Sequence, residues 1–420
     1  MRFIALLAAL TFVACTEVPD LTPHAERYMT LALAVGEHDP DYVDAYYGPA
    51  GLRDSVRAAA MTLPDIGSAA LGLSQELEHV ATPRDSVDQL RLAYLRAQVR
   101  SMMARVAQLS GQTMPFDEES RLTYDATAPH RDATYYQGLL DELEGVLPPG
   151  PGTVSQRVER YRQRFVIQPA RLDTVFRTAV AACRSRMLEH TTLPAEESFT
   201  IEYVTNQPWS GYNWYQGNYR SIIQVNTDLP IFIDRAIDLA CHEGYPGHHA
   251  YNVLLEQHLV NGRGWIEYQV YPLFSPQSLI AEGSANYGIA MAFPGATRWQ
   301  WEAEHLFPLA GLPGSEAEQY YRIQTLVGRL SHAGNEAARR YLDGEITAEL
   351  ATDWLVEYAL MAPERATQRI RFIERYRSYV INYNLGMDLV AAHVEAVPDG
   401  QRWARFLDLL STPRIASTLR

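Results

Sequence analysis

The chain has 420 residues, 47% of them hydrophobic, which is enough for a large core and more than a single domain usually contains. Its 50 aspartates and glutamates outnumber 36 basic residues, all of them arginines, and the net charge of −14 argues against nucleic acid as a partner. Three cysteines are too few for a disulfide framework.

The first residues have the pattern of an export signal. Arg2 precedes an apolar run, residues 4–14, that is too short to span a bilayer. The run ends in Phe12-Val13-Ala14-Cys15, which is similar to a bacterial lipoprotein cleavage box. We therefore expect residues 1–19 to be a signal peptide and tether. The exported protein would be anchored through a lipid on Cys15, with no other membrane contact, and would face the periplasm or the cell surface. A plain signal peptide is the alternative.

Residues 20–197 form the next region, and their apolar spacing is predominantly helical. Residues 86–109 are one example, with apolar side chains that we expect to face the core. Tyr42, Tyr46 and Tyr47 form an aromatic cluster before a Gly-Pro turn. We interpret it as a plug between helices, and a cleft-lining role is the alternative.

Between residues 199 and 228 the pattern changes to β-branched and aromatic residues around a turn rich in Gly, Asn and Trp. Residues 201–204 and 221–225 read as strands. We expect residues 221–226 to be an edge strand that can pair with an extended peptide, and the interior of a sheet is the alternative.

The segment after residue 240 carries the chemistry. His242 and Glu243 are followed by His248 and His249, so the segment offers imidazole ligands and a carboxylate base, the parts of a zinc hydrolase. On an ideal helix His248 would point roughly 120° away from His242, and His249 would lie about 10.5 Å along the axis. Pro246 and its flanking glycines predict that the helix opens here, which would bring His248 to the metal.

Three motifs in order resemble the DUF885 family of bacterial metallopeptidases. The hallmark H-E-x-x-P-G-H-H stands at residues 242–249, E-G-x-A-x-Y reads Glu282 to Tyr287, and Y-x-x-G reads Tyr383 to Gly386. The resemblance covers residues 242–386 and implies a zinc peptidase. Ser284 and Asn286 depart from the family's usual Trp and apolar residue, so the local packing and substrate pocket are expected to differ.

Together the motifs predict a metal site. His242, His248 and Glu282 are the expected Zn²⁺ ligands, an arrangement that resembles the gluzincin peptidases. The small residues around Glu282 suit a buried position, and Asn286, one turn later, is placed to bond a metal-bound imidazole. We choose His248 over His249 because a glycine precedes it, and we place His249 in a supporting or cleft-lining position.

The expected reaction is hydrolysis of a peptide bond by metal-activated water. Glu243 would act as general base and Tyr383 would donate to the oxyanion. Candidate substrate-binding residues are His249, Tyr287, Arg375 and Arg377. The arginines are included because a guanidinium can fork onto a peptide carboxylate, and a solvated or ion-paired arginine is the alternative. The alternatives are a zinc amide or ester hydrolase that is not a peptidase, and an inactive peptide-binding lipoprotein.

If Cys15 carries lipid, only Cys183 and Cys241 remain. Cys241 lies on an apolar segment, and we expect a buried free thiol there rather than a disulfide. The expected fold is mainly α: a large helical bundle with a small β-sheet beside the metal-binding helix and a gluzincin-like cleft. Residues 198–420 would be the metal-binding catalytic region. The sequence does not indicate an oligomeric state.

Overall fold

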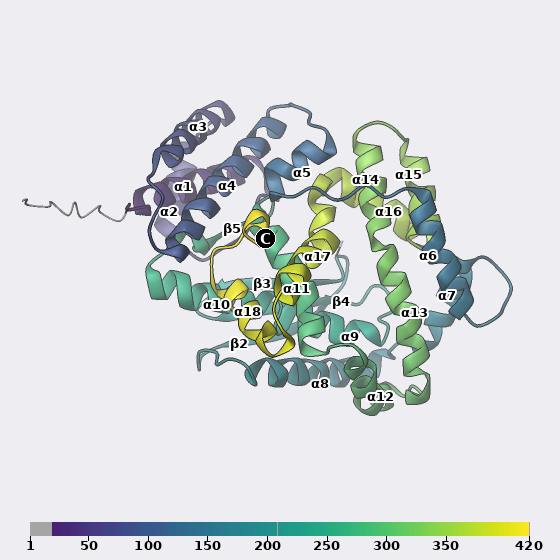
Figure 1. The fold of residues 1–420 in the computed structure, drawn as a ribbon. Coiled ribbons are helices and arrows are strands. Elements are labelled where there is room, and N and C mark those ends of the chain that lie inside the picture. The colour runs from purple at the N-terminus through teal and green to yellow at the C-terminus, as the bar shows by residue number, and fades with distance from the viewer. Residues whose placement is uncertain (1–18, 208, 420) are drawn as a thin grey trace, which may run out of the picture.

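A computed structural model describes residues 19–207 and 209–419, and they form a mainly α protein, as predicted (Figure 1). Helices of the first half lie on both flanks of the molecule, and α11 and α17 run through its middle. The lipoprotein box at Cys15 lies outside the described residues. No helix in the described part of the chain is long and apolar enough to cross a membrane.

The first half is helical apart from one short strand. Asp85 accepts hydrogen bonds from the backbone of Val87 and Asp88 and so caps the helix expected at residues 86–109. The helices are α1 (Thr22–His38), α2 (Ala50–Ala59), α3 (Leu63–His79), α4 (Ser86–Leu109), α5 (Phe116–Tyr124), α6 (Ala133–Val146), α7 (Val154–Arg162) and α8 (Pro169–Leu188).

The strands form two small sheets. β1 (Val43–Tyr46) pairs antiparallel with β5 (Val270–Pro272), so the two halves of the chain share a sheet. β2 (Ser198–Val204), β3 (Gly211–Gly217) and β4 (Arg220–Asn226) form the other, in the order β2-β4-β3. The expectation of an edge strand at 221–226 was wrong, because β4 is bonded on both sides. The edge strands are β2 and β3, and Asn213 on β3 donates to the Glu243 carbonyl at 2.8 Å.

The second half returns to helices. They are α9 (Asp234–Leu239), α10 (His248–Leu255), α11 (Pro276–Ala292), α12 (Ala296–Ala310), α13 (Ala317–Arg329), α14 (Ala333–Leu342), α15 (Ala348–Tyr358), α16 (Pro363–Tyr376), α17 (Ile381–Glu395) and α18 (Asp399–Ser411). A π-helical turn, η2 (Ala240–Gly244), follows α9, and a 3₁₀ turn, η7 (Arg377–Val380), precedes α17.

The central helices α11 and α17 touch backbone to backbone. A Cβ placed on Gly283 would lie 2.4 Å from the carbonyl carbon of Gly386, so neither position accepts a larger residue without moving a helix. The small residues around Glu282 therefore serve close packing, as predicted. This contact holds Glu282, on α11, near the tyrosines at the start of α17.

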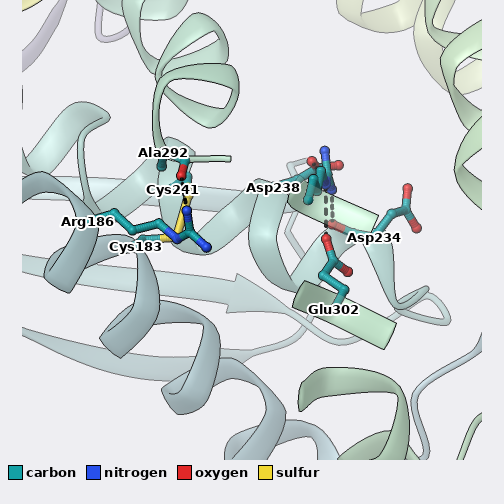
Figure 2. The surroundings of a disulfide bond; sticks show 8 residues. Cys183, Arg186, Asp234, Asp238, Cys241, Ala292 and Glu302 are labelled. Atoms are coloured by element: carbon teal, nitrogen blue, oxygen red, sulfur yellow. Dashed lines mark hydrogen bonds and ion pairs between the residues drawn. A yellow bond between two sulfur atoms is a disulfide. The ribbon is translucent and has the colours of Figure 1, made fainter. Parts of the chain in front are cut away.

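Cys183 on α8 and Cys241 in η2 form a disulfide with Cα atoms 5.6 Å apart (Figure 2). The expectation of a free thiol was wrong, because the helix α8 runs beside η2 and brings together two cysteines that are 58 positions apart. Arg186, one turn beyond Cys183, donates to the Ala292 carbonyl at the end of α11. α8 is therefore tied both to the histidine motif and to the helix that carries Glu282.

Candidate metal centre

The histidine motif leaves helical geometry where the sequence predicted. η2 widens the helix at residues 240–244, Tyr245 is extended, and α10 begins at His248. Gly247 allows the chain to turn back, since its N–H donates to the Cys241 carbonyl at 2.9 Å and a Cβ there would lie 1.9 Å from the His242 carbonyl oxygen. The opening brings His248 back beside His242.

Three side chains converge at this point. One donor atom from each of His242, His248 and Glu282 lies within 4.8 Å of the other two. Nε2 of His242 is 3.4 Å and Nε2 of His248 is 3.8 Å from Oε2 of Glu282. The imidazole rings stand almost perpendicular, with centroids 4.6 Å apart. Two imidazoles and a carboxylate whose donor atoms converge on one point, called the focus below, suit Zn²⁺ and leave a coordination position open.

Asn286 orients the first imidazole. Its Nδ2 donates to the Tyr383 carbonyl at 2.9 Å, so its Oδ1 accepts from Nδ1 of His242 at 3.0 Å. With the Nδ1 proton held in that bond, Nε2 of His242 carries a free lone pair that points to the focus. The hydrogen bond expected from Asn286 is thus confirmed.

The two oxygens of Glu282 have different environments. Oε1 accepts from the Tyr379 hydroxyl at 2.8 Å, whereas Oε2 is buried without a hydrogen-bond partner. An unpaired buried carboxylate oxygen is costly, and a cation would remove that cost. The residues present therefore fit a metal ion.

Burial also shapes the acid–base properties of the centre. It raises the pKa of Glu243 to about 7, with an opposing influence of His242 and a reinforcing one of Glu282. Burial and then the nearby His242 lower the pKa of His248 to about 4, so its ring is neutral, as a ligand must be. The pKa of Glu243 is thus close to neutral pH, which is where a general base works best.

Tyrosines surround the centre. Burial raises the pKa of Tyr383 well above its usual value, and the charge of Glu282 adds to the effect, so its hydroxyl stays protonated and can donate. Tyr379, whose ring centroid is 5.7 Å from that of Tyr383, was missed by sequence reasoning. Its spacing of four residues before Tyr383 is the signal that would have found it.

A further carboxylate nearby was also missed. Asp44 on β1 accepts from the Tyr212 hydroxyl at 3.0 Å, and burial raises its pKa to about 6, with Glu282 adding to the rise. Among the neighbouring tyrosines, the Tyr46 hydroxyl donates to the Pro49 carbonyl and that of Tyr47 to the Tyr268 carbonyl. Both hydroxyls are thus engaged within the protein, which agrees with a plug between elements.

His249 lies away from the focus. It is fully buried, Nε2 lies 2.8 Å from Glu197, and Nδ1 lies 2.8 Å from the Ser221 hydroxyl. Both ring nitrogens are therefore engaged inside the protein. Its predicted place as a supporting residue suits this geometry better than contact with a substrate.

The other three substrate-binding candidates also have partners. Tyr287 donates to Glu395 at 3.0 Å, Arg375 pairs with Asp41 at 2.6 Å, and Arg377 pairs with Glu119 at 2.6 Å. Their substrate roles stay predictions that this geometry does not favour, because each polar group is already satisfied.

No protein-family model matches the chain, and no curated protein matches it. Membership of the DUF885 family therefore stays a prediction. Among solved structures, the chain is similar to one described as "the putative lipoprotein from Colwellia psychrerythraea", at 16% identity and a TM-score of 0.53, over 85% of this chain and 68% of that one. It also aligns with Trypanosoma cruzi metallocarboxypeptidase 1 at 13% identity and a TM-score of 0.43, over 93% and 91% of the two chains. The first likeness shows a shared fold, and at its TM-score the second carries no argument.

Proposed function

We propose that this chain is a zinc metallopeptidase. The observation that carries the proposal is the convergence of His242, His248 and Glu282 beside the buried carboxylate of Glu243, with one oxygen of Glu282 left unpaired. Zinc bound there would act as a Lewis acid and make a water molecule acidic enough to lose a proton near neutral pH.

The side chains would divide the remaining work. Glu243 accepts the proton of the attacking water at its carboxylate and later delivers it to the leaving amine. The Tyr383 hydroxyl donates to the carbonyl oxygen as negative charge develops there. Asn286 holds the His242 ring in the tautomer that leaves Nε2 free. The free edge of β3, next to Glu243, is the place for an extended peptide to lie.

Zinc content and hydrolysis measured together test the proposal. Alanine at His242, His248 or Glu282 is expected to reduce zinc occupancy sharply, whereas Glu243→Gln keeps the metal and loses turnover. The wild-type protein is assayed on a peptide library and on a matched panel of esters and simple amides. Turnover of the second panel alone would favour a zinc hydrolase that is not a peptidase, and full activity of Glu243→Gln would refute the general base.

We further propose that the protein is exported and lipid-anchored at Cys15 in a bacterial envelope. The residues before Cys15 carry this proposal, and a disulfide suits an oxidising compartment. Metabolic labelling with palmitate tests it, with Cys15→Ala as the control. Equal absence of label in both proteins would refute the anchor.

A further inference from the structure

Arg369 on α16 differs from the other arginines of its segment. Its Nε is buried without a hydrogen-bond partner, and in the described part of the chain no carboxylate forms an ion pair with its guanidinium. Its contacts are aromatic, with Cζ 4.6 Å from the ring centroid of Phe372 and 5.9 Å from that of Tyr383. The side chain as a whole is half-buried. A partly desolvated cation without an anion is costly, so an anion from outside the chain would stabilise it.

This guanidinium lies next to the reaction centre. Tyr383, which it contacts, packs against Tyr379, and the Tyr379 hydroxyl bonds Glu282. The charges of Glu282, Arg369 and Glu243 all act on the Tyr383 hydroxyl. Two side chains, Tyr383 and Tyr379, therefore connect Arg369 to the proposed metal ligand Glu282.

Other cations gather on the same side. Arg365 lies one turn before Arg369 on the same face of α16. Burial and then the positive charges of Arg162 and Arg235 lower the pKa of Arg365, and the charge of Arg235 also acts on Glu243. Arg162 and Arg235 are paired with Asp234 at 3.9 Å and Asp238 at 3.5 Å, whereas among the described residues neither Arg365 nor Arg369 forms an ion pair. These two guanidiniums favour an anionic group on the ligand.

We propose that Arg369 binds the free C-terminal carboxylate of the peptide substrate, so that the enzyme releases one or two residues from the C-terminal end. The proposal rests on the proposed peptidase function and names its substrate class. A guanidinium forks onto a carboxylate through two parallel N–H donors, which fixes direction as well as position.

The expected product length follows from reach. An extended residue spans about 3.3–3.6 Å. If Tyr383 donates to the scissile carbonyl, the guanidinium 5.9 Å from its ring lies one or two residues away from that carbonyl. A carboxylate farther along the peptide would overshoot it.

A purely structural role is the competing explanation, since cation–π contacts with Phe372 and Tyr383 stabilise packing. Substrate choice distinguishes the two. A packing residue affects all substrates alike, whereas a carboxylate-binding residue affects only those that carry the carboxylate.

The test compares one N-blocked peptide as the free acid and as the C-terminal amide. Wild type is expected to cleave the acid with a kcat/KM about 100-fold higher than that for the amide. Mass spectrometry of the products should show the release of one or two residues. Arg369→Met keeps the side-chain bulk. It should lower kcat/KM for the acid about 100-fold and leave kcat/KM for the amide unchanged. Arg371→Met, an exposed arginine of the same helix, is the matched control and should behave as wild type.

Melting temperatures of each variant separate misfolding from a loss of binding. Should Arg369→Met fail to fold, Arg369→Lys is the second variant, because it keeps the charge without the two parallel N–H donors. Its kcat/KM is expected to fall about tenfold for the acid alone. Equal cleavage of acid and amide by wild type, or an equal loss of both in either variant, would overturn the proposal and leave the peptidase function intact.

If wild type cleaves neither peptide, the peptidase function fails, and calorimetric binding of an N-acetyl dipeptide and its amide decides about Arg369 separately. Binding of the acid that is about tenfold tighter than that of the amide, and lost in Arg369→Met, supports carboxylate recognition. Equal affinities for acid and amide in wild type and variant would overturn it.

Discussion

The Nδ1 of His242 and the side-chain oxygen of Asn286 lie 3.0 Å apart, and this bond joins the histidine motif to α11. The same amide holds the Tyr383 carbonyl, so one side chain orients a proposed ligand and the start of α17 together. The metal ligands, the base and the tyrosines therefore form one connected unit.

Asn286→Ala is expected to lower zinc affinity by about 10- to 100-fold, because the His242 ring loses the partner that fixes its tautomer. Titration of the metal-free protein in competition with a chelator measures the change. Asn286→Asp keeps an acceptor for Nδ1 and is the control that should retain most of the affinity. Equal affinity of wild type and Asn286→Ala would show that the ring needs no such support.

Alanine variants of the two adjacent histidines are expected to lose different properties, zinc binding in one and stability in the other. His248→Ala removes a ligand and should abolish stoichiometric zinc binding with little effect on folding. His249→Ala should bind zinc but lose about 1–3 kcal/mol of stability, because it leaves Glu197 and Ser221 with unmade buried hydrogen bonds. Zinc content and urea unfolding, measured side by side, check both. Loss of zinc in His249→Ala alone would reverse the assignment.

The phenol of Tyr383 is expected to act on the reaction rather than on the metal. Tyr383→Phe should lower kcat by about 100- to 1000-fold at unchanged zinc content, the usual cost of one oxyanion donor. Tyr379→Phe offers a contrast, since that hydroxyl bonds Glu282 and its loss should weaken zinc binding. A Tyr383→Phe enzyme with normal kcat would exclude the donor role.

The Cys183–Cys241 bridge is expected to contribute roughly 2–4 kcal/mol to the free energy of unfolding, because it closes a long loop in the unfolded chain. Cys183→Ser/Cys241→Ser should show this loss in urea unfolding. Because Cys241 precedes His242, zinc affinity of the double variant is measured as well. A double variant as stable as wild type would mean that the close packing of α8 on η2 suffices.

The features that the sequence predicts are those encoded within a few residues. The Pro246–Gly247 break depends on neighbours within about two helical turns. Asn286 was singled out by its spacing of one turn from Glu282, although its bond to His242 spans 44 positions. Partners distant in sequence decide the rest. Arg375 and Arg377 were candidates for a peptide carboxylate, with ion pairing as the alternative. Their partner carboxylates come from positions 334 and 258 residues earlier.

Strand order and the disulfide are of the same distant kind. The place of β4 in the middle of its sheet depends on β2, which pairs with it directly and in parallel although β3 lies between them in the sequence. Pairing of Cys183 with Cys241 depends on how α8 lies against η2. Local patterns carry no information about either relationship.

Acid is expected to weaken the fold through Glu197. Burial raises the pKa of this carboxyl, but hydrogen bonds from His249, Tyr245 and Arg184 outweigh it and leave the pKa at about 2, below the usual 4.5. A carboxyl with a lowered folded-state pKa contributes stability that is fully present above pH 4.5 and lost as the pH falls towards 2. The contribution is at most about 3 kcal/mol.

Urea unfolding of wild type and Glu197→Gln at pH 7, 5, 4 and 3 isolates this effect from other titrating groups. The variant should be the less stable protein at pH 7, because glutamine cannot pair with Arg184. The difference should shrink below pH 4.5, as wild-type Glu197 takes up the proton that its hydrogen bonds exclude. A constant difference across the four pH values would show that these bonds do not favour the charged carboxylate.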